Sequence, residues 1–307
     1  MKTPLLNPVL TKTASRYIAT LQTVGARIAP VVNVQDHAAQ YYVYDSSNFT
    51  DIPTNIQRAP ASGFKRLKSK LSSDSYIAQD YGIEEPMDKM QIRQFANVFA
   101  ADKAAMQRAV RVVALNHEIR VRDMARATTA TSSPSVKWGA SSGTTIIADL
   151  EAAKAVIRGK IGVTPNLLTL PYNVYRKLIL SPEIKTSFFG NTDGVLNKEK
   201  LESVLEVQIA VAGDLINTAQ EGQTPSLGDI WSNEAFLSYS NPSEDMTDLN
   251  WARTFNWVHA DGSGPVGIST FTYDQNEIDS RIVRARQYTD EKVVAAGAAY
   301  YFSAVLS

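Results

Sequence analysis

The sequence ANVFAADKAAMQRAVRVVALNHEIRVRDMARA, residues 96–127, contains neither proline nor glycine and is rich in alanine, arginine and methionine, which favour helices. Its apolar residues recur at helical spacing and place Met106, Val110, Val113, Val121 and Met124 on one face. At 1.5 Å per residue the predicted helix is about 48 Å long. Because an ordinary globular helix has about 11–12 residues, this one suits an extended, flat subunit better than a compact globule.

The polar face of this predicted helix is modestly basic. The segment contains six basic residues and only three acidic ones. The basic residues are Lys103, Arg108, Arg111, Arg120, Arg122 and Arg126, and the acidic ones are Asp102, Glu118 and Asp123. So many charges exclude a membrane-spanning helix. His117 falls where the apolar stripe would place a hydrophobic residue, without a partner at helical spacing for a metal or proton-relay site. We therefore expect a packed or interfacial histidine.

The composition is that of an ordinary folded protein. Of 307 residues, 44% are hydrophobic and 20% are charged, and the formal net charge is zero, so no global electrostatic argument favours a nucleic-acid binder. Cysteine is absent, which removes thiolate nucleophiles and cysteine metal sites. His37, His117 and His259 have no ligand-pair spacing, so no metal or cofactor site is predicted. Residues 1–17 contain no uninterrupted apolar segment, so no signal peptide or membrane anchor is expected.

The residues before the long helix divide into an arm and a loop. Residues 1–11, which include Pro4 and Pro8, are predicted to be extended and mobile. An amphipathic helix is predicted over residues 10–29, and Pro30 ends it before a strand at 31–34.

Residues 38–86 are predicted to form a long β-hairpin loop, with β-favouring runs at 38–46 and 64–83. Its charge is segregated, because residues 56–71 carry five basic side chains and no acid, and residues 72–88 carry five acids and no base. The ten are Arg58, Lys65, Arg66, Lys68 and Lys70, then Asp74, Asp80, Glu84, Glu85 and Asp88. Since an isolated two-stranded ribbon buries little, we expect the loop to lie on a neighbouring subunit. The alternative is a solvated hairpin with ordinary surface charge.

Helices and strands follow the long helix without a regular βαβ rhythm, which favours the α+β class. A connector rich in serine and threonine at 128–143 is predicted to end a subdomain. Helices are predicted over 146–161, 171–180 and 198–205, with Pro182 ending the second. Strands are predicted over 166–170, 208–213, 229–239 and 250–258, a loop over 188–197, and three strands after residue 268.

Two motifs match catalytic patterns in their letters only. Residues 139–143 read G-x-S-x-G, but a nucleophile elbow needs a preceding strand, and His259 is the one downstream histidine that could act as base. A serine hydrolase using Ser141 is kept as an alternative. Residues 262–267 read G-x-G-x-x-G, but Pro265 removes one backbone donor, so a hairpin turn is predicted.

Glu84 and Glu85 would point to opposite faces of a strand and make no acid–base pair. We predict no catalytic residues.

Short segments add to this layout: IAPVV at 28–32, RAP at 58–60, SSDSY at 72–76, EEP at 84–86, and TAQEG at 218–222 before Ile230-Trp231. Together with the order of the parts, they resemble the major capsid protein of tailed bacteriophages, whose fold is shared with herpesvirus capsid floors and encapsulin shells. The resemblance implies an N-terminal arm at 1–33 and a peripheral domain of 34–139 and 266–307. That domain would hold the extended loop at 38–86 and the spine helix at 96–127, and a central axial domain would occupy 140–265.

The resemblance also implies a function. It points to a structural, non-enzymatic subunit that self-assembles as hexamers and pentamers into an icosahedral phage head around double-stranded DNA, with the basic helix facing the genome. The alternative is an encapsulin-type shell around a cargo protein. Inter-subunit contacts are expected from the charged loop residues Arg58, Lys65, Arg66, Lys68, Lys70, Asp74, Asp80, Glu84 and Glu85.

Expected partners are other copies of the chain, DNA bound non-specifically, and separate scaffolding, portal and decoration proteins, with no membrane and no cofactor. The expected location is the virion, assembled in the host cytoplasm. Because the chain enters the arm almost at Met1, scaffolding is predicted to be a separate protein or absent.

Overall fold

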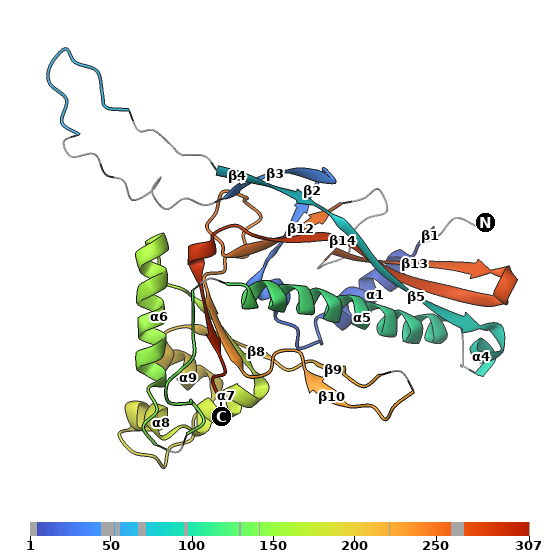
Figure 1. Ribbon diagram of the computed structural model, residues 1–307. Helices are drawn as coiled ribbons and strands as arrows, with labels where there is room; N and C mark the ends of the chain where they lie inside the picture. The colour runs from blue at the N-terminus through green and yellow to red at the C-terminus, as the bar shows by residue number, and fades with distance from the viewer. Residues whose placement is uncertain are drawn as a thin grey trace.

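Two β-sheets and one long helix organise the chain (Figure 1). The computed structural model describes residues 5–43, 52, 56–66, 72–94, 98–128, 130–140, 142–220, 222–258 and 267–306. Helices and strands are mixed without a βαβ repeat, so the predicted α+β class is confirmed.

The first sheet has six strands. Its order is β1 (Leu5–Leu6), β13 (Ile268–Gln275), β14 (Ser280–Val293), β12 (Ala252–Trp257) and β2 (Val31–Val34), and β5 (Gln79–Asp88) also pairs with β14. β2 runs parallel to β12, and the other pairs in this sheet are antiparallel. Along β14, buried and half-buried residues alternate from Val283 to Thr289, because successive side chains point to opposite faces of a strand.

The long helix is α5 (Val98–Arg126), which has 29 residues and confirms the helix predicted at 96–127. It lies along one face of the six-stranded sheet beside α1 (Pro8–Ile18) (Figure 1). Met106, Val110 and Val113 are buried in a cluster that includes Leu10 of α1 and Val283 of β14. The first three positions of the apolar stripe therefore join this helix to α1 and the six-stranded sheet, whereas Val121 is buried in the larger core cluster and Met124 packs against it.

The N-terminal segment differs from its prediction of an extended, mobile arm over residues 1–11. Leu5 and Leu6 pair with β13, and the Asn7 side chain accepts a hydrogen bond of 3.1 Å from the Leu10 N–H at the start of α1. Pro8 sits in the first turn, where the N–H that proline lacks would have no helical partner anyway. The single helix predicted at 10–29 is also wrong, because α1 ends at Ile18 and α2 (Gly25–Ile28) follows separately.

The second sheet has five strands, in the order β6 (Thr131–Ser132), β15 (Ala299–Ser303), β11 (Glu234–Ser238), β7 (Leu167–Pro171) and β8 (Gln208–Ala212). Every residue of β7 and β11 is buried, because these strands lie inside the sheet and are covered. The helices of this layer are α6 (Ile146–Ile161), α7 (Tyr172–Leu180), α8 (Pro182–Phe189) and α9 (Lys198–Leu205).

Two elements of the second layer escape the sequence patterns. α8 begins at Pro182, the residue expected only to end α7, since proline also suits the first turn of a new helix. β9 (Leu215–Asn217) and β10 (Leu227–Asp229) form a small antiparallel hairpin that lies below α5 in Figure 1. Short strands of three residues carry too little periodicity to be predicted.

The two layers exchange strands across the predicted domain boundaries. β12, from the segment predicted as axial, pairs with β14, and β15, from the segment predicted as peripheral, pairs with β11. These two strands therefore do not follow the boundaries at 140–265 and 266–307. The division into arm, peripheral and axial domains stays a prediction.

The predicted loop at 38–86 contains three strands. β3 (Ala38–Val43) and β4 (Ser72–Ile77) form an antiparallel ribbon, whereas β5 joins the six-stranded sheet. Residues 56–66 lie away from both sheets, and all of them are exposed (Figure 1). Lys68 and Lys70 lie outside the described residues. Shorter helices complete the fold: α4 (Lys89–Gln94) and the 3-10 turns at Asn276–Ile278 and Ala296–Ala298.

Candidate functional site

The described residues hold no cluster of metal-ligating side chains, and they do not provide the strand that the lettered serine motif needs. Within them, no three histidine, aspartate or glutamate side chains are grouped so that they could hold a metal ion. β6 ends at Ser132, and residues 133–140 contain no strand, so the G-x-S-x-G segment lacks the strand that a nucleophile elbow needs. Ser141, His259 and residues 262–266 lie outside the described residues. A search of the described segments finds no helix with the length and apolarity to span a membrane.

The C-terminal half of α5 is a junction that joins the two sheets, and buried Glu118 is its centre. Glu118 is 1% exposed, and its Oε2 accepts hydrogen bonds from the N–H groups of Val24 (3.0 Å) and Gly25 (2.6 Å). Its Oε1 accepts a hydrogen bond of 2.6 Å from the indole of Trp231. Burial raises the pKa of Glu118, and these three donors oppose that rise. A Cβ at Gly25 would lie 2.8 Å from Glu118 Oε2, so this close approach requires glycine.

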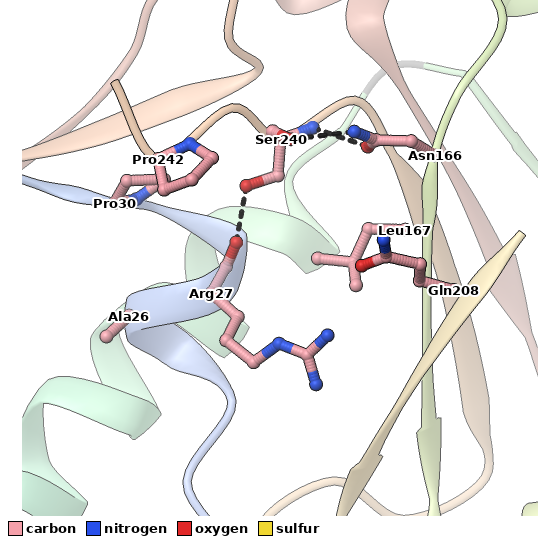
Figure 2. A pocket seen from close by; sticks show the side chains of 8 residues that line it. All are labelled: Ala26, Arg27, Pro30, Asn166, Leu167, Gln208, Ser240 and Pro242. Carbon is pink, nitrogen blue, oxygen red and sulfur yellow. Dashed lines mark hydrogen bonds between the residues drawn. The ribbon is translucent and has the colours of Figure 1, made fainter. Parts of the chain in front are cut away.

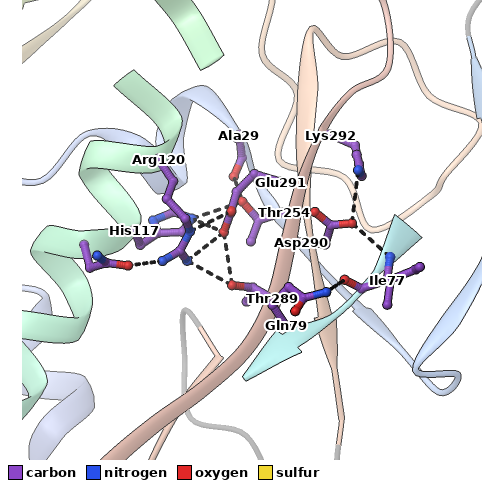
Figure 3. A network of polar contacts seen from close by, with 11 residues as sticks. Ala29, Ile77, Gln79, His117, Arg120, Thr254, Thr289, Asp290, Glu291 and Lys292 are labelled. Atoms are coloured by element: carbon purple, nitrogen blue, oxygen red, sulfur yellow. Dashed lines mark hydrogen bonds and ion pairs between the residues drawn. The ribbon is translucent and has the colours of Figure 1, made fainter. Parts of the chain in front are cut away.

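A second buried network connects α5 to β14 and β12 (Figure 3). Arg120 donates through Nε and Nη2 to the two carboxylate oxygens of Glu291, at 2.8 and 2.9 Å. His117 Nε2 lies 3.2 Å from Thr254 Oγ1, and the Thr254 hydroxyl donates to the Ala29 carbonyl, so His117 is the donor in their contact. Burial lowers the pKa of His117 to about 4, which keeps the ring neutral at pH 7. The expected packed histidine is confirmed.

The last turn of α5 binds the second sheet. Arg126 donates through Nε and Nη2 to Glu234, the first residue of β11, at 2.8 and 2.7 Å. The Tyr301 hydroxyl of β15 donates to the same carboxylate at 2.5 Å. Because α5 also binds Glu291 of β14, this helix is joined to each sheet by a bidentate arginine–carboxylate pair, whose two parallel hydrogen bonds fix the orientation of the partners.

The base of the β3–β4 ribbon is anchored by aromatic packing. Tyr76 is buried and stacks on Phe255 of β12 with ring centroids 4.5 Å apart, and Tyr41 lies 5.1 Å from the same ring. Burial together with Asp74 raises the pKa of Tyr41 to about 12. The Ile77 N–H donates to Asp290 of β14 at 2.9 Å. The ribbon therefore leaves the body from a fixed position.

The far end of this loop, residues 52 and 56–66, has the opposite character, and we call it the tip. Its large apolar side chains are exposed, with 83% exposure for Ile52 and 74% each for Ile56 and Phe64. Arg58 lies over the Phe64 ring at 4.8 Å, and Lys65 and Arg66 are exposed on the same segment. Apolar groups held this far from a body usually mark a surface that another molecule covers.

Known proteins resemble this chain over most of its length. No protein-family model matches the chain. The major capsid protein of Burkholderia phage BcepMu is 24% identical over 246 residues, which cover 78% of this chain and 77% of that protein. Among solved structures, a phage-related protein from Bordetella bronchiseptica has a TM-score of 0.73 at 17% identity, over 99% of this chain and 98% of that chain. A virus-like particle from Pyrococcus furiosus has a TM-score of 0.59 at 10% identity, over 96% and 99%.

The chain has the phage major capsid fold. The resemblance read from the order of the parts is therefore confirmed, and so is the fold predicted from it. Within this fold, the junction is the region of buried polar side chains, and the tip is the region of exposed apolar side chains.

The capsid fold pairs most of the predicted acidic contact residues within the same chain. The pairs are Asp80–Arg286 and Glu85–Arg108, with closest nitrogen–oxygen distances of 2.7 and 2.6 Å, and Glu84–Arg284, in which both Nε and Nη2 of the arginine contact Glu84 Oε1. Asp74 lies 3.4 Å from the Tyr41 hydroxyl at the base. Arginines of β14 and α5 therefore pair with Asp80, Glu84 and Glu85 within the chain, and the expectation that these acids also contact a neighbouring subunit stays a prediction. Glu84 and Glu85 do point to opposite faces.

A small cleft of about 180 Å³ lies between α2 and the second sheet of the capsid fold (Figure 2). Asn166 exchanges two hydrogen bonds with the Ser240 backbone, at 2.8 and 2.9 Å, and Ser240 Oγ donates to the Arg27 carbonyl at 2.5 Å. The Arg27 side chain reaches into the opening. Because the cleft is smaller than ordinary ligand pockets of about 300–1,000 Å³ and Asn166 and Ser240 bond each other, it is a joint between layers.

Sequence reasoning missed the junction residues of the capsid fold. Glu118 and Arg120 count only as charges on a polar face when the sequence is read alone. One signal was present: Glu118 stands three residues before Val121 on the flank of the apolar stripe, where an acid needs a partner. Nothing local identifies Trp231 or Glu291 as the partners, because they are more than a hundred residues away.

Proposed function

We propose that this chain is a structural, non-enzymatic major capsid protein, whose copies assemble as hexamers and pentamers into an icosahedral phage head that encloses double-stranded DNA. The observation that carries the proposal is the tip, which exposes Ile52, Ile56 and Phe64 on a ribbon with a fixed base. In a shell, a neighbouring copy covers these side chains and removes apolar surface from water. The capsid belongs to the virion and is assembled in the host cytoplasm.

The tip contact has an electrostatic component in this proposal. Arg58, Lys65 and Arg66 are exposed on the tip, and the described tip residues include no acid. With Lys68 and Lys70 of the same run, they would meet an acidic surface of the neighbouring copy. Asp74 would lie at the edge of this contact. Asp80, Glu84 and Glu85, which form ion pairs within their own subunit, would contact the neighbouring copy through the part of each side chain that stays exposed.

The remaining partners follow from the same role. A shell that encloses DNA contacts it without reading bases, because the phosphate backbone is the same in every sequence. Scaffolding, portal and decoration functions belong to separate proteins in this proposal.

Electron microscopy of the purified chain tests the proposal. We expect closed shells, and we expect a deletion of residues 56–66 to leave a folded subunit that forms none. A strictly monomeric wild-type chain would contradict the proposed function.

Replacing Arg58, Lys65 and Arg66 by glutamate should reduce the yield of shells most at low salt, where surface charge is least screened. If the variant and the wild type gave equal yields of shells at every salt concentration, charge would not guide the docking of one copy on another.

An encapsulin-type compartment is the second candidate, favoured by the likeness to the virus-like particle from Pyrococcus furiosus. The nucleic-acid content of native particles separates the two. Particles that protect DNA from nuclease support a phage head, whereas DNA-free particles filled with a second protein support a compartment. The hydrolase alternative is not proposed, because its motif lacks the required strand.

A further inference from the structure

The hairpin of β9 and β10 leaves one of its two faces open to solvent. Its exposed side chains alternate with half-buried ones along both strands, and they are Leu215, Asn217, Leu227 and Asp229. Ile216, on the other face, packs against the larger core cluster. No third strand among the described residues pairs with this hairpin. Because an isolated two-stranded ribbon is marginally stable in water, its two exposed leucines indicate a surface that another molecule covers.

The root of the hairpin is held by α5, so the open face has a fixed direction. Arg122 Nη1 donates to the Ile230 carbonyl at 3.2 Å, and Arg111 Nη2 lies 4.0 Å from Asp214. The next residue, Trp231, donates to Glu118 at the junction. A surface that is already positioned loses less conformational freedom when a partner binds it.

The outer face of α6 is also without a partner among the described residues. The inner face of this helix is buried at helical spacing from Ile146 to Ile161. The outer face is lined instead by exposed small or apolar residues, which are Ala148, Ala152, Ala155, Val156 and Gly159. Val156 is 40% exposed, and nothing lies within 4 Å of the Cβ position of Gly159. Since the solvent side of a helix normally carries polar side chains, this smooth strip suits close packing of another element.

The two surfaces also differ in charge. Residues 213–230, which include the hairpin, contain three acidic residues and no basic one, and Asp229 is exposed on the open face. The last turn of α6 carries Arg158 and Lys160, both exposed and neither in an ion pair with a described residue. Opposite charges beside two apolar surfaces favour their association in one orientation.

The hairpin and α6 lie on opposite flanks of the second sheet (Figure 1). Two different patches on opposite flanks of a subunit make a head-to-tail contact, which closes into a ring when rotation repeats it. We propose that the β9–β10 hairpin of one copy packs on the outer face of α6 of the next copy. This rests on the proposed function, whose hexamers and pentamers are such rings, and it names a contact separate from the tip.

Cysteine crosslinking tests this contact, because the chain contains no cysteine of its own. The full-length variant Leu227→Cys/Val156→Cys places one thiol on each surface, and the assembled protein is treated with a short bismaleimide. We expect a ladder of covalent oligomers up to the hexamer on a denaturing gel, because each copy is joined to the next. The variant Leu227→Cys/Tyr172→Cys is the matched control. It moves the second thiol to α7, where Tyr172 is also exposed, and should remain monomeric on the same gel.

An α6 variant that assembles into shells without a ladder overturns this inference, and so does an equal or stronger ladder from the α7 control. Shells are counted separately by electron microscopy. A wild-type chain that forms no shells contradicts the proposed function, whereas a ladder from the α6 variant in that case still supports the head-to-tail contact. Leu227 and Val156 are exposed, so we expect the variants to fold, and thermal unfolding verifies this.

Discussion

The junction at the C-terminal half of α5 and the tip at residues 52 and 56–66 are opposite kinds of structure in one chain. At the junction, Glu118, Arg120 and Arg126 are bonded to groups of the same molecule from both sheets. At the tip, large apolar and basic side chains extend into solvent with no body beneath them. The difference indicates that the subunit folds around its junction by its own contacts, whereas the tip is the part that the proposed function assigns to a contact with another copy.

The largest effect is expected from Glu118→Ala. It leaves the N–H groups of Val24, Gly25 and Trp231 buried without an acceptor, which should lower the free energy of unfolding by about 4 kcal/mol. Denaturant unfolding measures it. Glu151→Ala is the matched control, since Glu151 is an exposed partner of Lys154 on α6, and its effect should be below about 0.5 kcal/mol. If both variants changed the free energy of unfolding equally, Glu118 would not be the centre of the junction.

Within the loop, Tyr76→Ala and Phe64→Ala separate the base from the tip. Tyr76 is 2% exposed and stacked on Phe255, so its loss should lower the free energy of unfolding by about 3 kcal/mol. Phe64→Ala should change it by less than about 0.5 kcal/mol but reduce shell formation. Thermal unfolding together with particle counting measures both. If Phe64→Ala destabilised the isolated subunit as much as Tyr76→Ala, the tip would have intramolecular support.

Acid should weaken the junction through His117. Burial lowers the pKa of this ring from 6.5 to about 4. The neighbouring Glu291 carboxylate opposes this shift, and the Arg120 guanidinium adds to it. Between these values the unfolded chain binds a proton that the folded chain excludes, so stability falls as the pH drops from about 6.5 to about 4, by about 3 kcal/mol. His117→Gln should show a flatter stability profile in this window, and His37→Gln, an exposed ring, should keep the wild-type profile. Parallel profiles for wild type and His117→Gln would contradict the prediction.

A smaller effect is expected from Gly25→Ala. The added Cβ would lie 2.8 Å from Glu118 Oε2 and 3.3 Å from His117 Nδ1, both buried, which should lower the free energy of unfolding by about 2 kcal/mol. Gly159→Ala in α6 is the control, because nothing lies within 4 Å of its Cβ position. Alanine favours helix over glycine, so that variant should be stabilised by up to about 1 kcal/mol. Calorimetry of the two variants should therefore give shifts of opposite sign.

Part of the candidate site was readable from the sequence and part was not. The exposed basic run and the acid-rich run of the loop were both visible as charge segregation. The interpretation that both runs contact a neighbouring subunit stays a prediction, and the fold adds that Asp80 and Glu84 bind arginines of β14 about two hundred residues later. An acid-rich run in the sequence indicates that basic partners are needed. Only the register of β5 on β14 determines which arginines those partners are.

The sequence by itself determined the elements that rest on local periodicity, namely α5, α6, α9 and the three C-terminal strands, as well as the order of parts typical of the capsid fold. Tertiary structure alone decided that Pro182 begins a helix, that Leu5 and Leu6 add a strand, and that Glu118 is the buried centre of the junction. The physical reason is that periodicity follows from neighbours within a few residues. A buried carboxylate or an edge strand is instead stabilised by groups that only the folded chain brings within hydrogen-bond distance.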